Sequence, residues 1–268
     1  MYKLIAIDMD GTLLREDKTI SDRTKEAIKK AIEKGVKIVL ASGRPIEGLV
    51  RYLEELQLVT EEDYVMSFNG SVIQNVKTKE IISKNILKGS DLKVLYKLAQ
   101  QIGVNIHAFT KQGCVTPVMN EYTKLEGSIN GIEVHEMDFN KIDDDEDVIK
   151  VMFIDPEPVL AEAIEKIPAH TYEDFTVVRS APYFLEFLNK ASSKGTGVKA
   201  LAEHLGILKE EVICIGDAGN DLDMIEFAGL GVAMGNAFEE VKAAADYITL
   251  DNNSDGVAHV IEKFIGIS

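Results

Sequence analysis

Short apolar runs alternate with amphipathic segments at both ends of the chain. In the N-terminal part, strands are predicted over residues 3–8, 36–40 and 64–68, with helices over 21–34 and 46–57 between them. Apolar runs of this length, bounded by turn signals, are typical of buried strands. Their alternation with helices predicts a parallel sheet that is covered by helices on both faces.

The same rhythm resumes near residue 190. Helices are predicted over 194–204, 219–228 and 255–264, and strands over 211–215, 230–234 and 246–250. The fold class is therefore expected to be α/β. Residues 1–83 and 190–268 would form a three-layer, Rossmann-like core with a parallel sheet.

Residues 84–189 follow a different pattern. Helices are predicted over 91–102, 119–126 and 157–166, and strands over 104–109, 113–117, 148–154, 174–179 and 183–188. This order predicts an α+β module inserted into the core. The acidic stretch 138–147 is interpreted as a solvated loop, with a cation site as the alternative, and its role stays open.

Composition narrows the possible partners. The chain has 268 residues, of which 46% are hydrophobic, and a net charge of −16. That charge argues against binding to nucleic acid or anionic membranes, and an anionic substrate would need a local positive site. The two cysteines make no disulfide framework, and we see no signal peptide and no membrane-spanning run. We therefore expect a cytoplasmic protein, with its oligomeric state left open.

Two acidic residues end the first predicted strand. Asp8 stands at the end of the apolar run, and Asp10 follows two residues later, before a Gly-Thr turn. Two carboxylates ~4 Å apart repel each other by ~4 kcal/mol at an effective dielectric near 20, so a proton or a cation is needed between them. Because no cysteine or histidine is nearby, Mg2+ is the first candidate.

Polar groups also follow the later strands and open one helix: Ser42, Lys194, Asp217, Asn220 and Asp221. The ends of neighbouring parallel strands meet at one crevice of such a sheet. A carboxylate nucleophile, a second acid, a lysine and hydroxyl donors together suit phosphoryl transfer.

At these positions the sequence resembles the haloacid dehalogenase-like hydrolases over its whole length. Four motifs carry the resemblance, in the family's order: Asp8-Met9-Asp10-Gly11-Thr12, Ser42-Gly43-Arg44-Pro45, Ser193-Lys194-Gly195 and Gly216-Asp217-Ala218-Gly219-Asn220-Asp221. The Ser-Gly-Arg-Pro piece, Asn69-Gly70 and the large insert resemble the Cof-type branch, in which the insert is a C2 cap. The segments 180–186 and 231–237 are similar to those of YidA-like sugar-phosphate phosphatases.

The resemblance implies a role for each motif residue. Asp8 would be the nucleophile, Asp10 the general acid/base, and Lys194 the cation that neutralises the aspartyl-phosphate. Mg2+ would be held by Asp8, the backbone carbonyl of Asp10, and Asp217, with Asp221 supporting that shell. The residues implied to contact the phosphoryl group or substrate are Met9, Gly11, Ser42, Gly43, Arg44, Asn69 and Asn220.

These roles predict a Mg2+-dependent phosphatase of small phosphorylated metabolites, with sugar phosphates as the leading class. An acid at position 10 favours a phosphatase or a phosphosugar mutase over a dehalogenase. The alternatives are that mutase, a phospho-receiver module and a sugar-phosphate sensor that does not hydrolyse its ligand. A receiver would be shorter and lack the insert, and the Asp8/Asp10 pair argues against a sensor.

Overall fold

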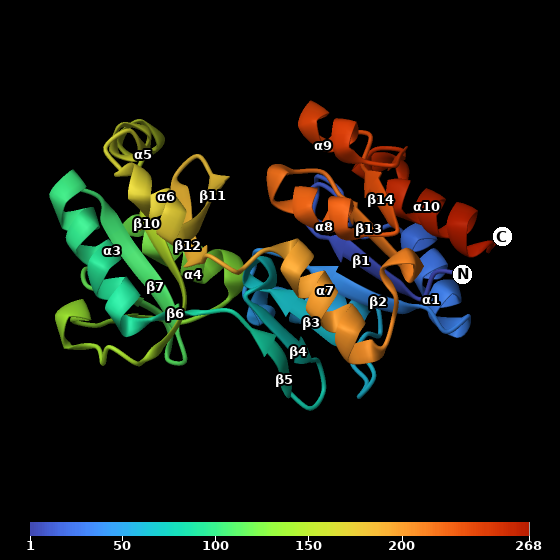
Figure 1. Ribbon diagram of the computed structural model, residues 1–268, viewed down its shortest axis with the longest axis horizontal. Helices are drawn as coiled ribbons and strands as arrows, with labels where there is room; N and C mark the ends of the chain where they lie inside the picture. Colours follow the sequence, from blue (N-terminus) through green and yellow to red (C-terminus); the bar gives the residue numbers. More distant parts are fainter. Residues whose placement is uncertain (268) are drawn as a thin grey trace. The chain divides into compact units, whose positions relative to one another are not determined.

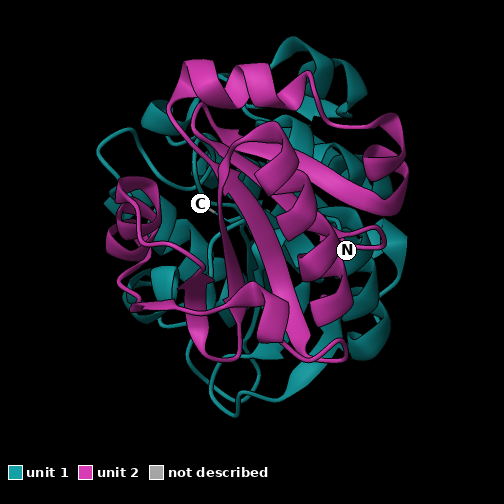
Figure 2. Ribbon diagram, turned by 90° about the vertical axis from the view of Figure 1, so that its left-hand side faces the viewer, with its two compact units in different colours: residues 1–84, 193–268 teal, residues 85–192 magenta. Residues whose placement is uncertain are grey.

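The computed structural model describes residues 1–267 and divides the chain into two compact units (Figure 2). Unit 1 is formed by Met1–Lys84 and by the chain from Ser193 onward, and unit 2 by Asn85–Ser192. Unit 2 is thus inserted between two segments that build unit 1 together. Within the described residues, no helix is long and apolar enough to cross a membrane.

Unit 1 is an eight-stranded sheet with helices on both faces (Figure 1). Its strands are β1 (Leu4–Asp8), β2 (Lys37–Ala41), β3 (Tyr64–Ser67), β4 (Val72–Asn75), β5 (Ile81–Lys84), β13 (Val212–Gly216), β14 (Leu230–Ala233) and β15 (Tyr247–Ile248). Its helices are α1 (Asp22–Glu33), α2 (Val50–Glu55), α7 (Lys194–Leu205), α8 (Leu222–Phe227), α9 (Glu239–Ala244) and α10 (Gly256–Ile265). The order β15-β14-β13-β1-β2-β3-β4-β5 puts β1 in the middle, between β13 and β2.

The side chains of β1 contribute to two separate hydrophobic cores. Ile5 and Ile7 are buried against α1 and α10, which lie side by side on one face (Figure 1). Leu4 and Ala6 are buried on the opposite face, against α7 and α8. Because successive side chains of a strand point to opposite faces, an apolar residue is needed at every position of a strand covered on both sides. The α/β class and the three layers are thereby confirmed.

Unit 2 is an α+β module with its own core. Its strands are β6 (Leu87–Lys88), β7 (Asn105–Thr110), β8 (Gly113–Thr116), β9 (Val134–Glu136), β10 (Asp147–Ile154), β11 (Phe175–Ala181) and β12 (Phe184–Asn189). Its helices are α3 (Gly89–Ile102), α4 (Glu121–Asn130), α5 (Glu157–Ile164) and α6 (Ala169–Asp174). The sheet runs in the order β11-β12-β10-β7-β8-β9, with β6 paired to β10.

The structure differs from the sequence-based prediction at several elements. The sheet of unit 1 is not wholly parallel, because β4 and β5 extend it in antiparallel order beyond β3. The helix predicted over 46–57 is a 3-10 turn at Ile46–Gly48 followed by the short α2. In unit 2, α4 begins and ends later than the predicted helix 119–126, and β6, β9 and α6 had not been predicted.

Candidate active site

The carboxyl ends of the central parallel strands carry the polar residues singled out in the sequence. Asp8 ends β1, Asp217 follows β13, Ser42 follows β2 and Asn69 follows β3. Because β13, β1, β2 and β3 are parallel neighbours, their carboxyl ends lie at one edge of the sheet.

A buried lysine joins two of the carboxylates at this edge. Lys194 Nζ donates to Asp8 Oδ1 at 2.5 Å and to Asp221 Oδ1 at 2.6 Å, and its side chain is fully buried. Lys194 is the first residue of α7, where Ser193 caps the helix by accepting from the Thr196 N–H. A cation is unfavourable at the positive end of a helix, so the two carboxylates must offset both that dipole and the burial. Burial alone would lower the pKa of Lys194, but the charges of Asp221 and Asp8 raise it.

Asp221 holds the turn that carries Asp217. Its second oxygen, Oδ2, accepts from the backbone N–H of Asp217 at 2.9 Å and of Ala218 at 3.0 Å. Asp221 is fully buried, so these bonds and the one from Lys194 replace its lost hydration. Its position behind Asp217 is therefore fixed by three donors.

The carboxylates of Asp8 and Asp217 lie close together where little water reaches them. Burial, followed by the charge of Asp221, raises the pKa of Asp8 well above its usual value, although Lys194 opposes this rise. Burial also raises the pKa of Asp217 to about 6, while the Thr12 hydroxyl, which donates to Asp217 Oδ1 at 2.8 Å, acts in the opposite direction. Shifts in this direction indicate carboxylates that lack enough positive charge around them.

The donor set fits a hard divalent cation. Asp8, Asp217 and Asp221 can each offer one carboxylate oxygen, and these oxygens all lie within 4.8 Å of one another. Carboxylate oxygens are the ligands that Mg2+ prefers, and a cation would supply the missing charge. Asp221 already accepts three hydrogen bonds, which suits it to support the site from behind rather than to bind the ion itself.

The side chain of Asp10 is bound to two cations. Arg44 forms a bidentate pair with it, from Nε to Oδ2 at 2.8 Å and from Nη2 to Oδ1 at 2.7 Å. Lys18 Nζ donates to the same Oδ1 at 2.8 Å. Burial would raise the pKa of Asp10, but the hydrogen bonds and charges of Arg44 and Lys18 lower it below its usual value. In this arrangement the carboxylate is ionised at neutral pH.

The remaining predicted residues form a second group beside the strand ends. Asn220 Nδ2 donates to Asn69 Oδ1 at 3.0 Å, and the Asn69 N–H donates to the Ser42 carbonyl at 2.9 Å. The Ser42 hydroxyl accepts from the Arg44 N–H at 3.1 Å. Asn69 has a left-handed backbone (φ 54°) that turns the chain sharply after β3.

Small residues allow the backbone to approach the carboxylates. Gly11 has a φ of +91°, and a Cβ there would collide with the Asp217 carboxylate. A Cβ on Gly43 would lie 3.1 Å from Asn69 Nδ2, which is tighter than an ordinary contact. The Met9 side chain is fully buried in a hydrophobic core of unit 1, so only its backbone is available at the site.

Sequence reasoning had missed two residues of this group. Lys18 was not singled out from the sequence as a site residue, although it pairs with Asp10. Thr12 had been treated only as part of a turn, although it donates to Asp217. Thr12 lies within the first motif and could have been tested for contact with the later acids, whereas Lys18 lies in a loop without any periodic signal.

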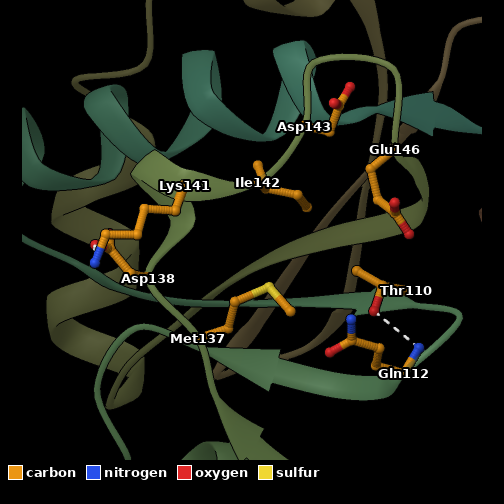
Figure 3. A pocket seen from close by; sticks show the side chains of 8 residues that line it. All are labelled: Thr110, Gln112, Met137, Asp138, Lys141, Ile142, Asp143 and Glu146. Carbon is orange, nitrogen blue, oxygen red and sulfur yellow. Dashed lines mark hydrogen bonds and ion pairs between the residues drawn. The ribbon is translucent and has the colours of Figure 1, made fainter.

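The acidic stretch 138–147 belongs to unit 2 and is neutralised mainly by lysines. Asp144 pairs with Lys93 at 2.7 Å and Asp147 with Lys88 at 2.6 Å. Part of the stretch borders a pocket of about 380 Å³. Figure 3 shows the residues that line it: Thr110, Gln112, Met137, Asp138, Lys141, Ile142, Asp143 and Glu146. Among residues 1–267, a group of three close carboxylates that could hold a metal is found at Asp8, Asp217 and Asp221, and not in this stretch.

Comparison with known proteins places the chain in a family. The model of the haloacid dehalogenase-like hydrolase family matches residues 5–261. YxeH of Bacillus subtilis (strain 168), which is named as a proposed phosphatase, is 46% identical over 270 residues, covering 99% of both chains. The 5-amino-6-(5-phospho-D-ribitylamino)uracil phosphatase YcsE of the same organism is 32% identical, over 98% of this chain and 96% of its own length.

Solved structures agree with these relatives. A haloacid dehalogenase-like hydrolase from Bacteroides thetaiotaomicron is 39% identical, with a TM-score of 0.86 over 98% of this chain and 99% of that one. The subclass IIB sugar phosphatase BT4131 is 30% identical, with a TM-score of 0.82 over 99% of this chain and 100% of its own. The chain therefore belongs to the haloacid dehalogenase-like hydrolases, in the Cof-type branch (subclass IIB), and is a phosphoric monoester hydrolase.

Proposed function

We propose that this phosphatase is Mg2+-dependent and hydrolyses small phosphorylated metabolites, above all sugar phosphates, through an aspartyl-phosphate on Asp8. The observation that carries the proposal is the pairing of Asp8 with the fully buried Lys194 at 2.5 Å, beside Asp217 and Asp221. The similarity to the sugar phosphatase BT4131 supports the substrate class.

Asp8 acts as the nucleophile in the first step. Lys194 holds one of its carboxylate oxygens, so the other oxygen attacks phosphorus in line with the leaving group. The new Asp8–phosphorus bond forms as the bond from phosphorus to the ester oxygen breaks. Asp10 gives its proton to the departing alkoxide.

Asp10 acts as the base in the second step. It takes a proton from a water molecule, and the water oxygen attacks phosphorus and displaces the Asp8 carboxylate, which releases inorganic phosphate. Because Arg44 and Lys18 keep Asp10 ionised in the structure, it must exchange at least one of these partners before it can carry a proton in the first step. An incoming phosphate group, itself an anion, is a suitable new partner for Arg44.

The metal-binding residues would be Asp8, Asp217 and the backbone carbonyl of Asp10, with Asp221 supporting Asp217. Bound Mg2+ would neutralise part of the charge on the phosphoryl oxygens. The phosphoryl oxygens would be held by the Ser42 hydroxyl, Asn220 and the backbone N–H groups of Met9 and Gly11. Gly43, Arg44 and Asn69 complete the proposed binding surface, because they surround Ser42 and Asn220.

Unit 2 is proposed to act as the cap that reads the leaving group. This role rests on its independent core and on its insertion between the two segments of the catalytic unit. The loops of such a module can change without disturbing the strand ends that carry the chemistry. Selectivity among sugars is therefore assigned to the inserted segment, residues 84–189.

The test is release of inorganic phosphate from a panel of sugar phosphates and one aryl phosphate, with Mg2+ or with a chelator. We expect release that requires the metal and that discriminates among the sugars. Release that is unaffected by the chelator would refute the metal dependence. A shift of phosphate within a sugar, with no release, would identify a mutase, and tight binding without either reaction would identify a sensor.

A further inference from the structure

The loop between β1 and α1 carries Asp10 and Gly11 but has little regular structure of its own. Residues 9–20 contain four buried apolar residues, Met9, Leu13, Leu14 and Ile20. The loop is also tied to two turns near the C-terminal end of the chain, which follow β14 and β15. These ties involve asparagine side chains that have no part in the chemistry described above.

Two asparagines form a continuous hydrogen-bonded bridge to this loop. Asn236 Nδ2 donates to the Gly11 carbonyl at 2.8 Å, and Asn236 Oδ1 accepts from the Asn252 N–H at 3.0 Å. Asn252 Nδ2 in turn donates to the Leu14 carbonyl at 2.8 Å. The bridge thus holds the Gly11–Thr12 peptide at one end and the Leu14 carbonyl, further along the same loop, at the other.

The turn that carries Asn236 also holds the end of β13. The Met234 N–H donates to the Gly216 carbonyl and the Phe238 N–H to the Asp217 carbonyl, both at 3.0 Å. The Gly235 N–H donates to the Leu250 carbonyl at 3.0 Å, and a Cβ on Gly235 would press against the backbone of Asp251. A single short turn therefore links the backbone at Asp217 to the backbone at Gly11.

We propose that Asn236 and Asn252 are positioning residues, which fix the Gly11–Thr12 peptide, directly after Asp10 and Gly11, relative to Asp217 and so set the geometry of proton transfer by Asp10. The proposal rests on the proposed role of Asp10. Asn236 is exposed, so its side chain adds little to the buried core, yet both ends of its amide have backbone partners. A small misplacement of an acid/base group is costly, because proton transfer needs hydrogen-bond distance to the leaving group.

The test compares two substrates that differ in their need for a proton. The alkoxide of a sugar phosphate leaves with a proton from Asp10, whereas the phenolate of an aryl phosphate bearing a nitro group leaves without one. The quantity measured is kcat/KM, which includes the steps up to departure of the leaving group. The variants are Asn236→Ala, Asn252→Ala and the double variant. The control is Asn140→Ala, since Asn140 is an exposed asparagine of unit 2 whose backbone N–H and side-chain Nδ2 both donate to Asp138 Oδ1.

We expect each single variant to lose about 5- to 10-fold in kcat/KM for the sugar phosphate and about 2-fold or less for the aryl phosphate, the range that one or two hydrogen bonds supply. Because both asparagines act through one bridge, the double variant should lose about as much as either single variant. Amide hydrogen exchange in residues 9–20 should also become faster in both single variants and stay unchanged in Asn140→Ala.

Equal losses for the two substrates, or no loss for either, would overturn the proposal. Unchanged exchange in residues 9–20 would overturn it as well. If the wild-type protein released no phosphate from any substrate, the proposed function would fall, while the exchange measurement would still decide whether the bridge holds the loop.

Discussion

A single buried ammonium group organises the acidic end of the sheet. Lys194 contacts Asp8 and Asp221, and Asp221 contacts the backbone at Asp217, so three motifs far apart in the sequence are connected through one residue. Buried ion pairs with complete hydrogen bonding give geometric specificity more than stability. The Asp8 carboxylate, the proposed nucleophile, is therefore placed by its bond to Lys194 rather than by packing alone.

Asp8→Asn should abolish turnover without harming the fold. Asparagine is a poor nucleophile, so we expect kcat to fall by more than about a thousandfold. Because burial and the charge of Asp221 raise the pKa of Asp8, a neutral side chain should leave the melting temperature equal or higher. Phosphate release and thermal unfolding measure the two effects, and Asp22→Asn, at an exposed position on α1, serves as the control. Substantial residual hydrolysis would contradict a covalent intermediate on Asp8.

The raised pKa of Asp217 predicts a pH dependence of stability in metal-free protein. Its pKa is about 6, against an ordinary value of 3.8, so the folded state binds more protons between these values. By linkage, the contribution of Asp217 to stability is present below about pH 4 and is lost as the pH rises through 6. We expect Asp217→Asn, which cannot ionise, to gain roughly 2 kcal/mol relative to wild type between pH 4.5 and 7.

The comparison with Asp217→Asn is necessary because His107 changes the pH dependence of stability in the opposite direction to Asp217. Burial lowers the pKa of His107 to about 3, so its contribution to stability rises with pH up to about 6.5. Both proteins contain His107, so urea unfolding of the pair in chelator isolates Asp217. A difference in the free energy of unfolding that stays constant from pH 4.5 to 7 would show that the surroundings do not raise the pKa of Asp217. Added Mg2+ should remove the pH-dependent part of that difference.

The site could be predicted well where a motif stands at a strand end. Asp8 and Asp217 lie together because the parallel strands β1 and β13 direct their carboxyl ends to one edge, and Lys194, the first residue of α7, contacts Asp8 and Asp221 there. The bonds to Asp10 from Arg44 and Lys18 could not be predicted, because loop residues 9–20 have no periodicity that would orient their side chains. The bonds of Asn236 to Gly11 and Asn252 could not be predicted either, because they also join loop residues.

At the scale of elements, α4 has an unusual distribution of side chains. Its buried residues are Thr123, Glu126, Gly127 and Asn130, whereas Leu125 and Ile129 are exposed. The buried Glu126 lies 3.7 Å from Lys150 of β10, which in turn lies 3.3 Å from Glu186 of β12. The helix is therefore held to the sheet of unit 2 by polar contacts rather than by an apolar face; they are these charges and the hydrogen bond between Thr123 Oγ1 and His107 Nδ1 of β7 at 3.2 Å.

Lys150→Met should destabilise unit 2 strongly. Removing the lysine between Glu126 and Glu186 takes its positive charge away from two buried carboxylates, a loss of about 3–5 kcal/mol. Unfolding in urea, followed by the fluorescence of a probe attached to unit 2, measures this loss. Lys97→Met, at an exposed position of α3, is the matched control and should be neutral within about 0.5 kcal/mol. A loss below about 1 kcal/mol for Lys150→Met would show that the cluster does not support the fold.

The distribution on α4 also explains why its bounds were predicted wrongly. Sequence patterns place a helix by its apolar stripe, which is assumed to face the core. In α4 that stripe faces solvent, so the buried polar residues near Asn130 gave no helical signal. The strand β5 was missed for a related reason, since it is a largely exposed edge strand without clear alternation. The central strands, apolar on both faces, were predicted correctly.

At the scale of the whole molecule, the two compact units differ in how the chain builds them. Unit 1 is assembled from both ends of the chain, and unit 2 is a single continuous segment. The residues of the candidate active site that the structure brings together all belong to unit 1. The chain as a whole is strongly acidic, with a net charge of −16. At the strand ends, however, three cations lie close to the acidic side chains: Lys194, Arg44 and Lys18.

Replacing residues 85–192 by a short Gly-Ser linker should leave unit 1 folded. The two connecting segments are adjacent, since the Ser192 hydroxyl donates to the Asn85 carbonyl at 2.6 Å, so a short linker can span them. We expect this variant to keep Mg2+-dependent hydrolysis of an aryl phosphate and to lose discrimination among sugar phosphates. Circular dichroism and the substrate panel check this, with Asp8→Asn in the same shortened chain as the control. Retained discrimination would refute the proposed role of unit 2.

The bond between Ser192 and Asn85 also has a consequence for the order in which the chain folds. Before unit 2 forms, β5 and α7 are joined by a long flexible loop, and closing such a loop costs about 4 kcal/mol of chain entropy. Once unit 2 is folded, its two ends are already side by side, and almost none of that cost remains. The folded insert therefore brings together the two parts of the unit 1 sheet, which are far apart in the sequence.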